Sequence, residues 1–263
     1  MNGDIVKPDV LAPGVNILGA WPFDIAPYPS PFATKTFNFE TGTSMATPHV
    51  SGIVALVKYR HRDWSPAAIQ SAIITSAKDQ DDDGNSILDD VGDGPAGIYA
   101  TGAGQVSPAR ALDPDMVYDL TYEDYIGYLC GLGYNDTEVS WTASEPVQCS
   151  SVNAISPSQL NYPSIAVSFK IGTSATTQTV RRTATNVGEA NEVYRVRITE
   201  PKGVKVYLST YELRFARIKQ QQNYYVTLVL QKSPGKKGLV SRGKIEWYSD
   251  KHSVTSPIAV RFT

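Results

Sequence analysis

The chain has 263 residues, with 24 Lys plus Arg against 26 Asp plus Glu and a formal net charge of −2. This balance argues against nucleic acid as a partner, because nucleic-acid binding relies on an excess of positive charge. Hydrophobic residues make up 41% and charged residues 19%, which is typical of a globular chain of one or two domains. No apolar run approaches the roughly 20 residues that cross a bilayer, so we expect no membrane partner, and no motif indicates a cofactor.

The charges are distributed unevenly along the chain. Residues 1–159 carry seven Lys plus Arg against 20 Asp plus Glu, a net charge of −13, whereas residues 160–263 carry 17 against six, a net charge of +11. This asymmetry predicts two differently built units whose opposite charges help them to dock, within a screening length of roughly 8 Å. The basic half suggests the hypothesis that it binds acidic cell-wall polysaccharide. The alternative is an ordinary solvated surface.

The first expected elements are a β-rich segment from Asp9 to Leu18, interrupted at 12–14, and a short extended segment at 37–40. A helix follows, and its residues 50–57 are apolar on nearly every side, which predicts a helix in the centre of a domain. Ser44 lies at the start of this helix, where backbone N–H groups lack intrahelical acceptors and can hold a developing oxyanion. Ser44 is therefore a candidate nucleophile, with a simple N-cap as the alternative.

A second core helix is expected after Ser65 and Pro66, which supply an N-cap and a first-turn proline. Apolar residues recur after them at helical spacing, namely Ile69, Ala72, Ile73 and Ala77. These helices need a sheet to cover them, and a parallel sheet covered on both faces is the usual partner. We therefore expect residues 1–115 to be unstable when expressed alone.

Residues 79–90 match part of a calcium-binding loop. Asp79, Asp81 and Asp83 fall at its first, third and fifth positions, and Asp90 falls at the twelfth. Asp90 is shorter than the usual glutamate, and the sequence after it cannot begin an exit helix. These aspartates are thus weak metal candidates, and a polar surface loop is the alternative.

Residues 120–133 predict a connecting helix that begins after Thr121 and stops at Gly131. From Asn161 the pattern becomes all-β, because short segments rich in Val, Ile, Tyr and Thr alternate with turn residues. Seven strands are expected, at 164–170, 178–187, 192–199, 204–209, 222–231, 242–248 and 254–262. This number of strands in about 100 residues predicts a β-sandwich. Its aromatic residues are interpreted as core and rim rather than as ligand platforms: Tyr194, Phe215, Tyr224, Tyr225 and Trp247.

Residues 41–52 read Thr-Gly-Thr-Ser-Met-Ala-Thr-Pro-His-Val-Ser-Gly, and this string resembles the signature around the reactive serine of subtilisin-like proteases, the subtilases. The segments 7–17, 63–69 and 160–165 are similar to the plant, cucumisin-like branch. Residues 99–114 are similar to the end of its catalytic domain, although Gln105 stands where the family usually has histidine. Residues 183–188 and 257–260 look like the fibronectin type III-like domain that follows. The resemblance implies the C-terminal part of an α/β subtilase catalytic domain at 1–115, a connecting helix and loop at 116–160, and a fibronectin type III-like sandwich at 161–263.

The resemblance also implies a serine endopeptidase in which Ser44 is the nucleophile and its backbone N–H is one oxyanion donor. In this family the triad order is Asp, then His, then Ser, so both partners are expected upstream of this chain. His49 lies about 140° around the helix from Ser44 and is interpreted as helix packing, and no motif places His61 or His252 as a base. We therefore expect the isolated chain to be an inactive fragment that uses its missing N-terminal catalytic portion in trans. The alternative function is a non-catalytic binding or regulatory module that docks on a related protease or a cell-wall component.

Family members are normally secreted, which implies an extracellular location in the apoplast or cell wall. Residues 1–7 nevertheless lack the basic start and apolar core of a signal peptide, so we expect an upstream start or a shortened product. In a secreted family, Cys130 and Cys149 are expected to form a disulfide, with two unpaired buried thiols as the alternative. Asn135 fits the glycosylation sequon Asn-Asp-Thr, which also occurs by chance.

Overall fold

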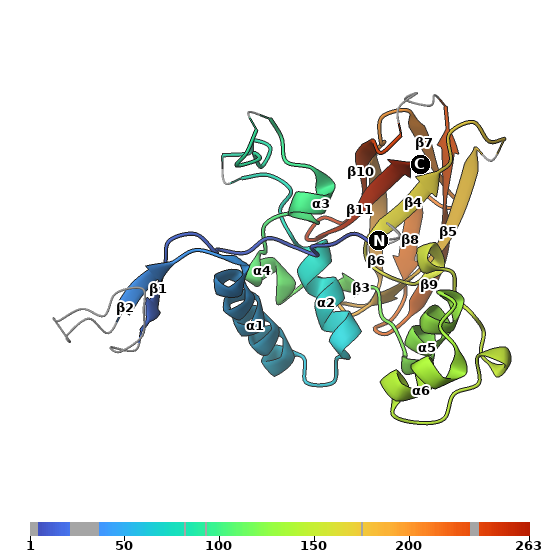
Figure 1. Cartoon of the computed structure of the whole chain (residues 1–263), viewed down its shortest axis with the longest axis horizontal. Coiled ribbons are helices and arrows are strands. Elements are labelled where there is room, and N and C mark those ends of the chain that lie inside the picture. Colours follow the sequence, from blue (N-terminus) through green and yellow to red (C-terminus); the bar gives the residue numbers. More distant parts are fainter. Residues whose placement is uncertain (1–4, 22–36, 82, 93, 175, 232–236) are drawn as a thin grey trace.

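The computed structural model describes residues 5–21, 37–81, 83–92, 94–174, 176–231 and 237–263 (Figure 1). Its helices are α1 (Thr43–Arg60), α2 (Pro66–Thr75), α3 (Ile98–Thr101), α4 (Pro108–Ala111), α5 (Tyr122–Gly131) and α6 (Asp136–Ala143), followed by the 3-10 turns η1 (Cys149–Ser151) and η2 (Pro157–Gln159). The strands are β1 (Ile17–Ala20), β2 (Phe37–Glu40), β3 (Met116–Val117), β4 (Ile165–Phe169), β5 (Thr177–Asn186), β6 (Glu192–Thr199), β7 (Val204–Leu208), β8 (Glu212–Phe215), β9 (Gln221–Leu230), β10 (Val240–Tyr248) and β11 (Ser253–Phe262). No helix among these described residues is both long and apolar enough to cross a membrane.

The C-terminal part of the chain is a sandwich of two sheets. One sheet has the strand order β4-β11-β10-β6-β8, and the other has the order β3-β5-β9-β7. Neighbouring strands are antiparallel, except that β4 pairs with β11 in parallel. All seven strands expected from the sequence are confirmed. The four-residue strand β8 and the two-residue strand β3 were not predicted, because such short segments carry too little alternation to be recognised.

The sandwich core is formed by side chains that alternate with exposed residues along each strand, as the pleat requires. Trp247 and Tyr224 meet edge to face at 5.2 Å between ring centroids, and both are fully buried, as are Tyr194 and Phe215. The interpretation of these four residues as core is confirmed. Tyr225 differs from them, since half of its surface remains exposed.

The N-terminal part of the chain holds α1, α2 and α4, together with the antiparallel ribbon β1-β2. The buried residues Ile53 and Val57 of α1 pack against Ile69 and Ile73 of α2. The expectation that α1 is buried on nearly every side is wrong for this chain, because Ile53 and Val57 are its only fully buried residues. Among the described residues before 116, parallel strand pairing is limited to a single bridge between Leu11 and Gln105. Within the described segments, the apolar sides of α1 are therefore not covered by a parallel sheet.

The two parts share an interface in which apolar and polar contacts are both present. Ala68 and Ala72 of α2 pack on Val117, and a second small cluster joins Val6 and Ile98 to Ala166 and Ala259 on strands β4 and β11. Among the described residues, lysine–aspartate ion pairs join the acidic half of the chain to the basic half at Lys244–Asp79, 2.7 Å, and at Lys219–Asp63, 3.0 Å. Both are partly or largely exposed, so each adds at most about 1 kcal/mol.

The helix caps expected from the sequence are also present. The Ser65 hydroxyl accepts a hydrogen bond from the Ala68 N–H at 2.9 Å at the start of α2. At the start of α5, Thr121 and Asp124 form a reciprocal capping box, and the helix ends at Gly131. These local signals were readable because capping depends on residues only three positions apart.

Candidate active site

Ser44 is positioned by a close contact between two loop segments. The N–H of Gly42 donates to the carbonyl oxygen of Gly14 at 2.8 Å, which ties the segment after Leu11 to the start of α1. A Cβ atom at Gly14 would lie 2.9 Å from the Gly42 oxygen, so only glycine permits this approach without a shift. A second bond, from the Asn16 N–H to the Thr41 hydroxyl at 2.9 Å, holds the same two segments together.

The start of α1 leaves backbone donors free beside Ser44. The Gly42 carbonyl accepts the first helical bonds, from Met45 N–H at 3.0 Å and Ala46 N–H at 3.3 Å. The N–H groups of Thr43 and Ser44 precede these bonds and have no acceptor within the helix. The first turn contains no acidic residue, so the positive end of the helix dipole is not neutralised by a neighbouring side chain. Ser44 is exposed, and its surroundings can therefore accept a developing negative charge.

The three histidines of the sequence all lie in described segments, and none is hydrogen-bonded to Ser44. His49 is exposed, and its Nδ1 lies 2.9 Å from the Met45 carbonyl oxygen one turn back, so its interpretation as helix packing is wrong. His61 stacks on Trp64 with ring centroids 3.8 Å apart, and its Nε2 lies 2.8 Å from the Leu112 carbonyl oxygen.

His252 lies in the turn between β10 and β11, within a group of acidic side chains. Its Nε2 is 3.1 Å from Asp113, and its Nδ1 is 3.2 Å from Asp115. The buried Asp115 also accepts a hydrogen bond from the Tyr194 hydroxyl. The ring of His252 is thus placed against carboxylates of this chain and not against the Ser44 hydroxyl.

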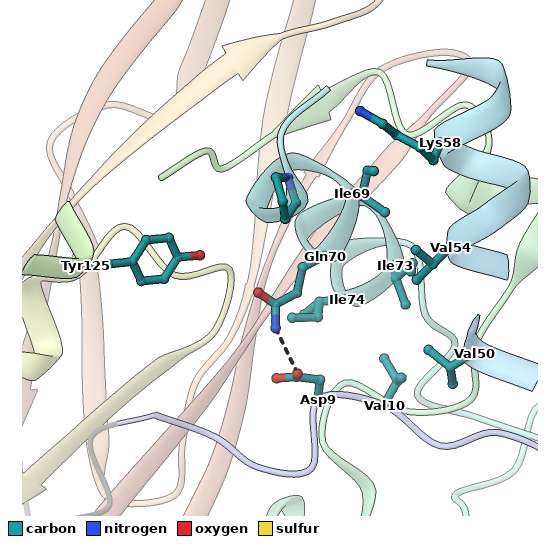
Figure 2. A pocket seen from close by; sticks show the side chains of 11 residues that line it. Asp9, Val10, Val50, Val54, Lys58, Ile69, Gln70, Ile73, Ile74 and Tyr125 are labelled. Atoms are coloured by element: carbon teal, nitrogen blue, oxygen red, sulfur yellow. Dashed lines mark hydrogen bonds between the residues drawn. The ribbon is translucent and has the colours of Figure 1, made fainter. Parts of the chain in front are cut away.

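Two apolar grooves border α1. One, of about 620 Å³, is lined by Val50 and Val54 of α1 and by Ile69 and Ile73 of α2, with Asp9 and Gln70 hydrogen-bonded at 3.0 Å on one side (Figure 2). The other, of about 760 Å³, starts beside the nucleophile loop and also reaches Val50 and Val54; its lining includes Gly14, Gly42, Thr43, Ala46 and Thr47. A continuous apolar side of α1 thus begins next to Ser44.

The neighbouring β1-β2 ribbon is also apolar and exposed, which the sequence did not indicate. Leu18 and Phe39 are direct cross-strand partners and share one face with Phe37. Phe37 and Phe39 are 60% and 66% exposed. On α1 itself, Leu56 is 53% exposed. These side chains add to the exposed apolar surface beside α1 in the described part of the chain.

The acidic loop at 79–90 is occupied by internal contacts. One carboxylate oxygen of Asp81 accepts hydrogen bonds from the N–H groups of Asp83 and Asn85. Asp79 pairs with Lys244 instead of turning toward these residues. Within the described part of the chain, no three His, Cys, Asp or Glu side chains gather in a way that could hold a metal ion.

The segment from α5 to η1 contains the candidate disulfide and the candidate glycosylation position. Cys130 and Cys149 form a disulfide with a sulfur-to-sulfur distance of 2.00 Å. Asn135 is exposed and caps α6, because its side-chain oxygen accepts from the Glu138 N–H at 3.0 Å.

Gln105 has a structural role, since its backbone exchanges two hydrogen bonds of 2.8 Å with Lys78.

Comparison with known proteins gives two family matches and a set of close relatives. Residues 2–94 match the model of the subtilase family, and residues 159–260 match a model described as fibronectin type-III domain. The chain is 42% identical to subtilisin-like protease SBT1.2 and 41% identical to subtilisin-like protease SBT1.6, both of Arabidopsis thaliana. These alignments cover 98% and 99% of this chain but 34% and 35% of the relatives, so the chain spans about a third of their length.

Proposed function

Because this chain belongs to the subtilase family and corresponds to the C-terminal portion of plant subtilisin-like proteases, we propose that it carries the nucleophile of a serine endopeptidase site. The observation that supports this role most directly is the position of Ser44. It is an exposed hydroxyl in the first turn of α1, beside backbone N–H groups without helical acceptors. That arrangement matches the needs of acyl transfer.

In the proposed reaction, the Ser44 Oγ attacks the carbonyl carbon of a peptide bond while a histidine takes the hydroxyl proton. The carbonyl oxygen becomes an oxyanion, which the Ser44 N–H stabilises. The carbon–nitrogen bond then breaks, and the amine leaves with the proton from the histidine. Water hydrolyses the resulting acyl-enzyme and regenerates the serine.

We further propose that the 263-residue chain does not catalyse this reaction alone. His49, His61 and His252 are each directed at other groups, so the base and its carboxylate must come from an additional polypeptide segment. The grooves along α1 and the exposed Leu56 and Phe39 support a segment that packs on this side. The remainder of a subtilase domain, joined to this chain or added in trans, is the partner that fits.

An activity-based fluorophosphonate probe tests the proposal, because it labels a serine only when the hydroxyl is activated. The isolated chain is expected to remain unlabelled. Labelling is expected when it is co-expressed with the portion of SBT1.2 outside the matched region, and Ser44→Ala should abolish it. Ser51→Ala is the matched control, since Ser51 lies on the same helix with its hydroxyl bonded to the Thr47 carbonyl. Labelling of the isolated chain would refute the need for a partner, and labelling that survives Ser44→Ala would refute the nucleophile.

We also propose that the chain is extracellular and glycosylated at Asn135. The disulfide between Cys130 and Cys149 is typical of an oxidising compartment. The Asn135 side-chain nitrogen is the atom that would be modified, and its oxygen can still cap α6. Expression in plant cells should give a product whose mass falls after treatment with an N-glycosidase, whereas Asn135→Gln should show no change. An unmodified wild-type chain in the secreted fraction would contradict this proposal.

A further inference from the structure

The outer face of the β3-β5-β9-β7 sheet has an unusual composition. Seven of the side chains of β5, β9 and β7 that point away from the core form what we call the threonine–tyrosine face: Thr179, Arg181, Thr183, Tyr207, Asn223, Tyr225 and Thr227. Tyr207 and Tyr225 are 51% and 50% exposed, although most other tyrosines of the sandwich strands are buried. Figure 1 shows β5 on the side of the sandwich away from α1. This face is therefore remote from Ser44.

Strand register fixes the neighbours on this face. Arg181 lies directly opposite Tyr225, and Thr179 lies directly opposite Thr227. Tyr207 pairs with Thr227 on the other side of β9, so the two tyrosines are diagonal neighbours, roughly 7–8 Å apart. Hydrogen bonds order the polar groups of β5 and β9 on this face: Thr179 to Thr227 at 3.1 Å, Thr183 to Asn223 at 2.6 Å and Arg181 to Asn223 at 3.0 Å.

The charge of the threonine–tyrosine face is positive and unbalanced. No carboxylate forms an ion pair with Arg181 among the described residues, and none of the face's own side chains is acidic. At the edge of the sheet, Lys205 is already paired with Glu200 at 2.8 Å. Arg181 is thus a cation held in place by a neutral amide, which leaves it able to receive an anionic group.

A polar groove of about 460 Å³ continues from this face. Arg181 and Thr183 contribute to its lining, together with the polar residues Asn153, Ser156, Gln159 and Asn161, the acidic Asp124, and Ala154 and Ile155. Gln159 is fixed in place, because its amide donates to the Thr179 carbonyl at 2.7 Å and accepts from the Arg181 N–H at 3.1 Å. The groove therefore extends the row of amide and hydroxyl groups beyond the edge of the sheet.

We propose that the threonine–tyrosine face and this groove bind a chain of uronic-acid sugars. The tyrosine rings offer flat surfaces for the C–H faces of sugar rings, and the hydroxyl and amide groups match sugar hydroxyls. The Arg181 guanidinium pairs with a sugar carboxylate next to the ring stacked on Tyr225. The binding is independent of Ser44 and goes beyond the proteolytic function proposed above.

Other polymers fit this surface less well. A nucleic acid needs several cations along its phosphates, and Arg181 is the one unpaired cation of the face. A protein partner that binds by apolar burial needs an apolar centre, whereas threonine, asparagine and arginine side chains surround the two tyrosines here. A neutral polysaccharide would leave Arg181 without an anionic partner.

Affinity electrophoresis of the full chain through gels containing polygalacturonate tests the proposal. Arg181→Gln is expected to weaken binding about tenfold or more, since it removes a charge-assisted hydrogen bond. Tyr225→Thr is expected to weaken it about fivefold or more, and threonine, like tyrosine, has a high strand propensity. Tyr225→Phe should bind as the wild type does. Arg195→Gln is the matched control, because Arg195 is an exposed arginine of β6 in the opposite sheet.

Each outcome decides the proposal once thermal unfolding shows that the variants fold. Loss in Arg181→Gln and Tyr225→Thr with retention in Arg195→Gln and Tyr225→Phe supports it. The proposal would be overturned if the wild type did not bind, or if Arg195→Gln and Arg181→Gln lost binding equally. It would also be overturned if a fully methyl-esterified polymer or a neutral mannan retained the protein equally well. Ser44→Ala should bind as the wild type does, which separates this result from the test of the protease site.

Discussion

The phenol of Tyr162 should be a main point of attachment between the two parts of the chain. Its hydroxyl donates to Asp9 at 2.5 Å and accepts from Gln70 at 2.9 Å and from Lys7 at 2.8 Å. Tyr162 follows the connecting segment, whereas its three partners belong to the N-terminal part. Burial, followed by the charge of Asp9 and the hydrogen bond to it, raises the Tyr162 pKa well above its usual range. The neutral phenol is therefore the form that the fold requires.

Tyr162→Phe removes this hydroxyl and keeps the ring. The lost hydrogen bond to a charged acceptor is worth about 1.5–3 kcal/mol. For a chain of this size, each 1 kcal/mol shifts Tm by about 2–4 °C, so we expect Tm to fall by about 3–12 °C. Tyr207→Phe is the control, because its hydroxyl lies on an exposed side chain and its loss should change stability by less than about 0.5 kcal/mol.

Thermal unfolding followed by circular dichroism measures both variants under the same conditions. Asp9→Asn combined with Tyr162→Phe should destabilise less than the sum of the single changes, with a coupling of about 0.5–3 kcal/mol. Equal Tm values for Tyr162→Phe and Tyr207→Phe, or strict additivity with Asp9→Asn, would show that this hydroxyl does not join the two parts.

Three further predictions concern stability. Replacing both Cys130 and Cys149 with serine should cost about 3 kcal/mol, because the bridge closes a segment of 19 residues; an unchanged Tm with and without reductant would contradict this. Burial and the hydrogen bond to Asp115 raise the pKa of Tyr194 above its usual 10. The stabilisation by the neutral Tyr194 hydroxyl should therefore be present below about pH 10 and be lost as pH rises. Tyr194→Phe should accordingly flatten the fall of Tm between pH 9 and 11. Gly102→Ala should cost about 3 kcal/mol or more, because its φ is +56° and a Cβ would lie 2.2 Å from the Pro8 oxygen. Gly52→Ala, which meets nothing within 4 Å, should instead stabilise α1 by about 0.5–1 kcal/mol, and equal urea midpoints for these two variants would refute the steric argument.

Local signals predicted much of the fold. The strands of the sandwich and the caps of α2 and α5 were readable, because alternation and capping act over a few residues. The burial of α1 was not predicted correctly. Residues 50–57 are apolar on nearly every side, a pattern that predicts packing partners all around the helix. In the described part of this chain, only Ile53 and Val57 of α1 are buried.

The candidate site, too, could be predicted from the sequence only in part. Ser44 and its helix start could be identified from the sequence, since a serine in a first turn lies beside free N–H groups wherever that helix is placed. The roles of His61 and His252 could not, because their partners Leu112, Asp113 and Asp115 are brought to them only by packing.

The sequence by itself determined the identity of the elements and the position of the candidate nucleophile, because these depend on local periodicity and on a motif of consecutive residues. The tertiary structure alone decided which surfaces remain open. It placed Tyr224 in the core and the adjacent Tyr225 on an exposed face opposite Arg181, because sheet register assigns neighbouring residues to opposite faces. It also left the apolar side of α1 uncovered, because burial depends on elements that are distant in the sequence.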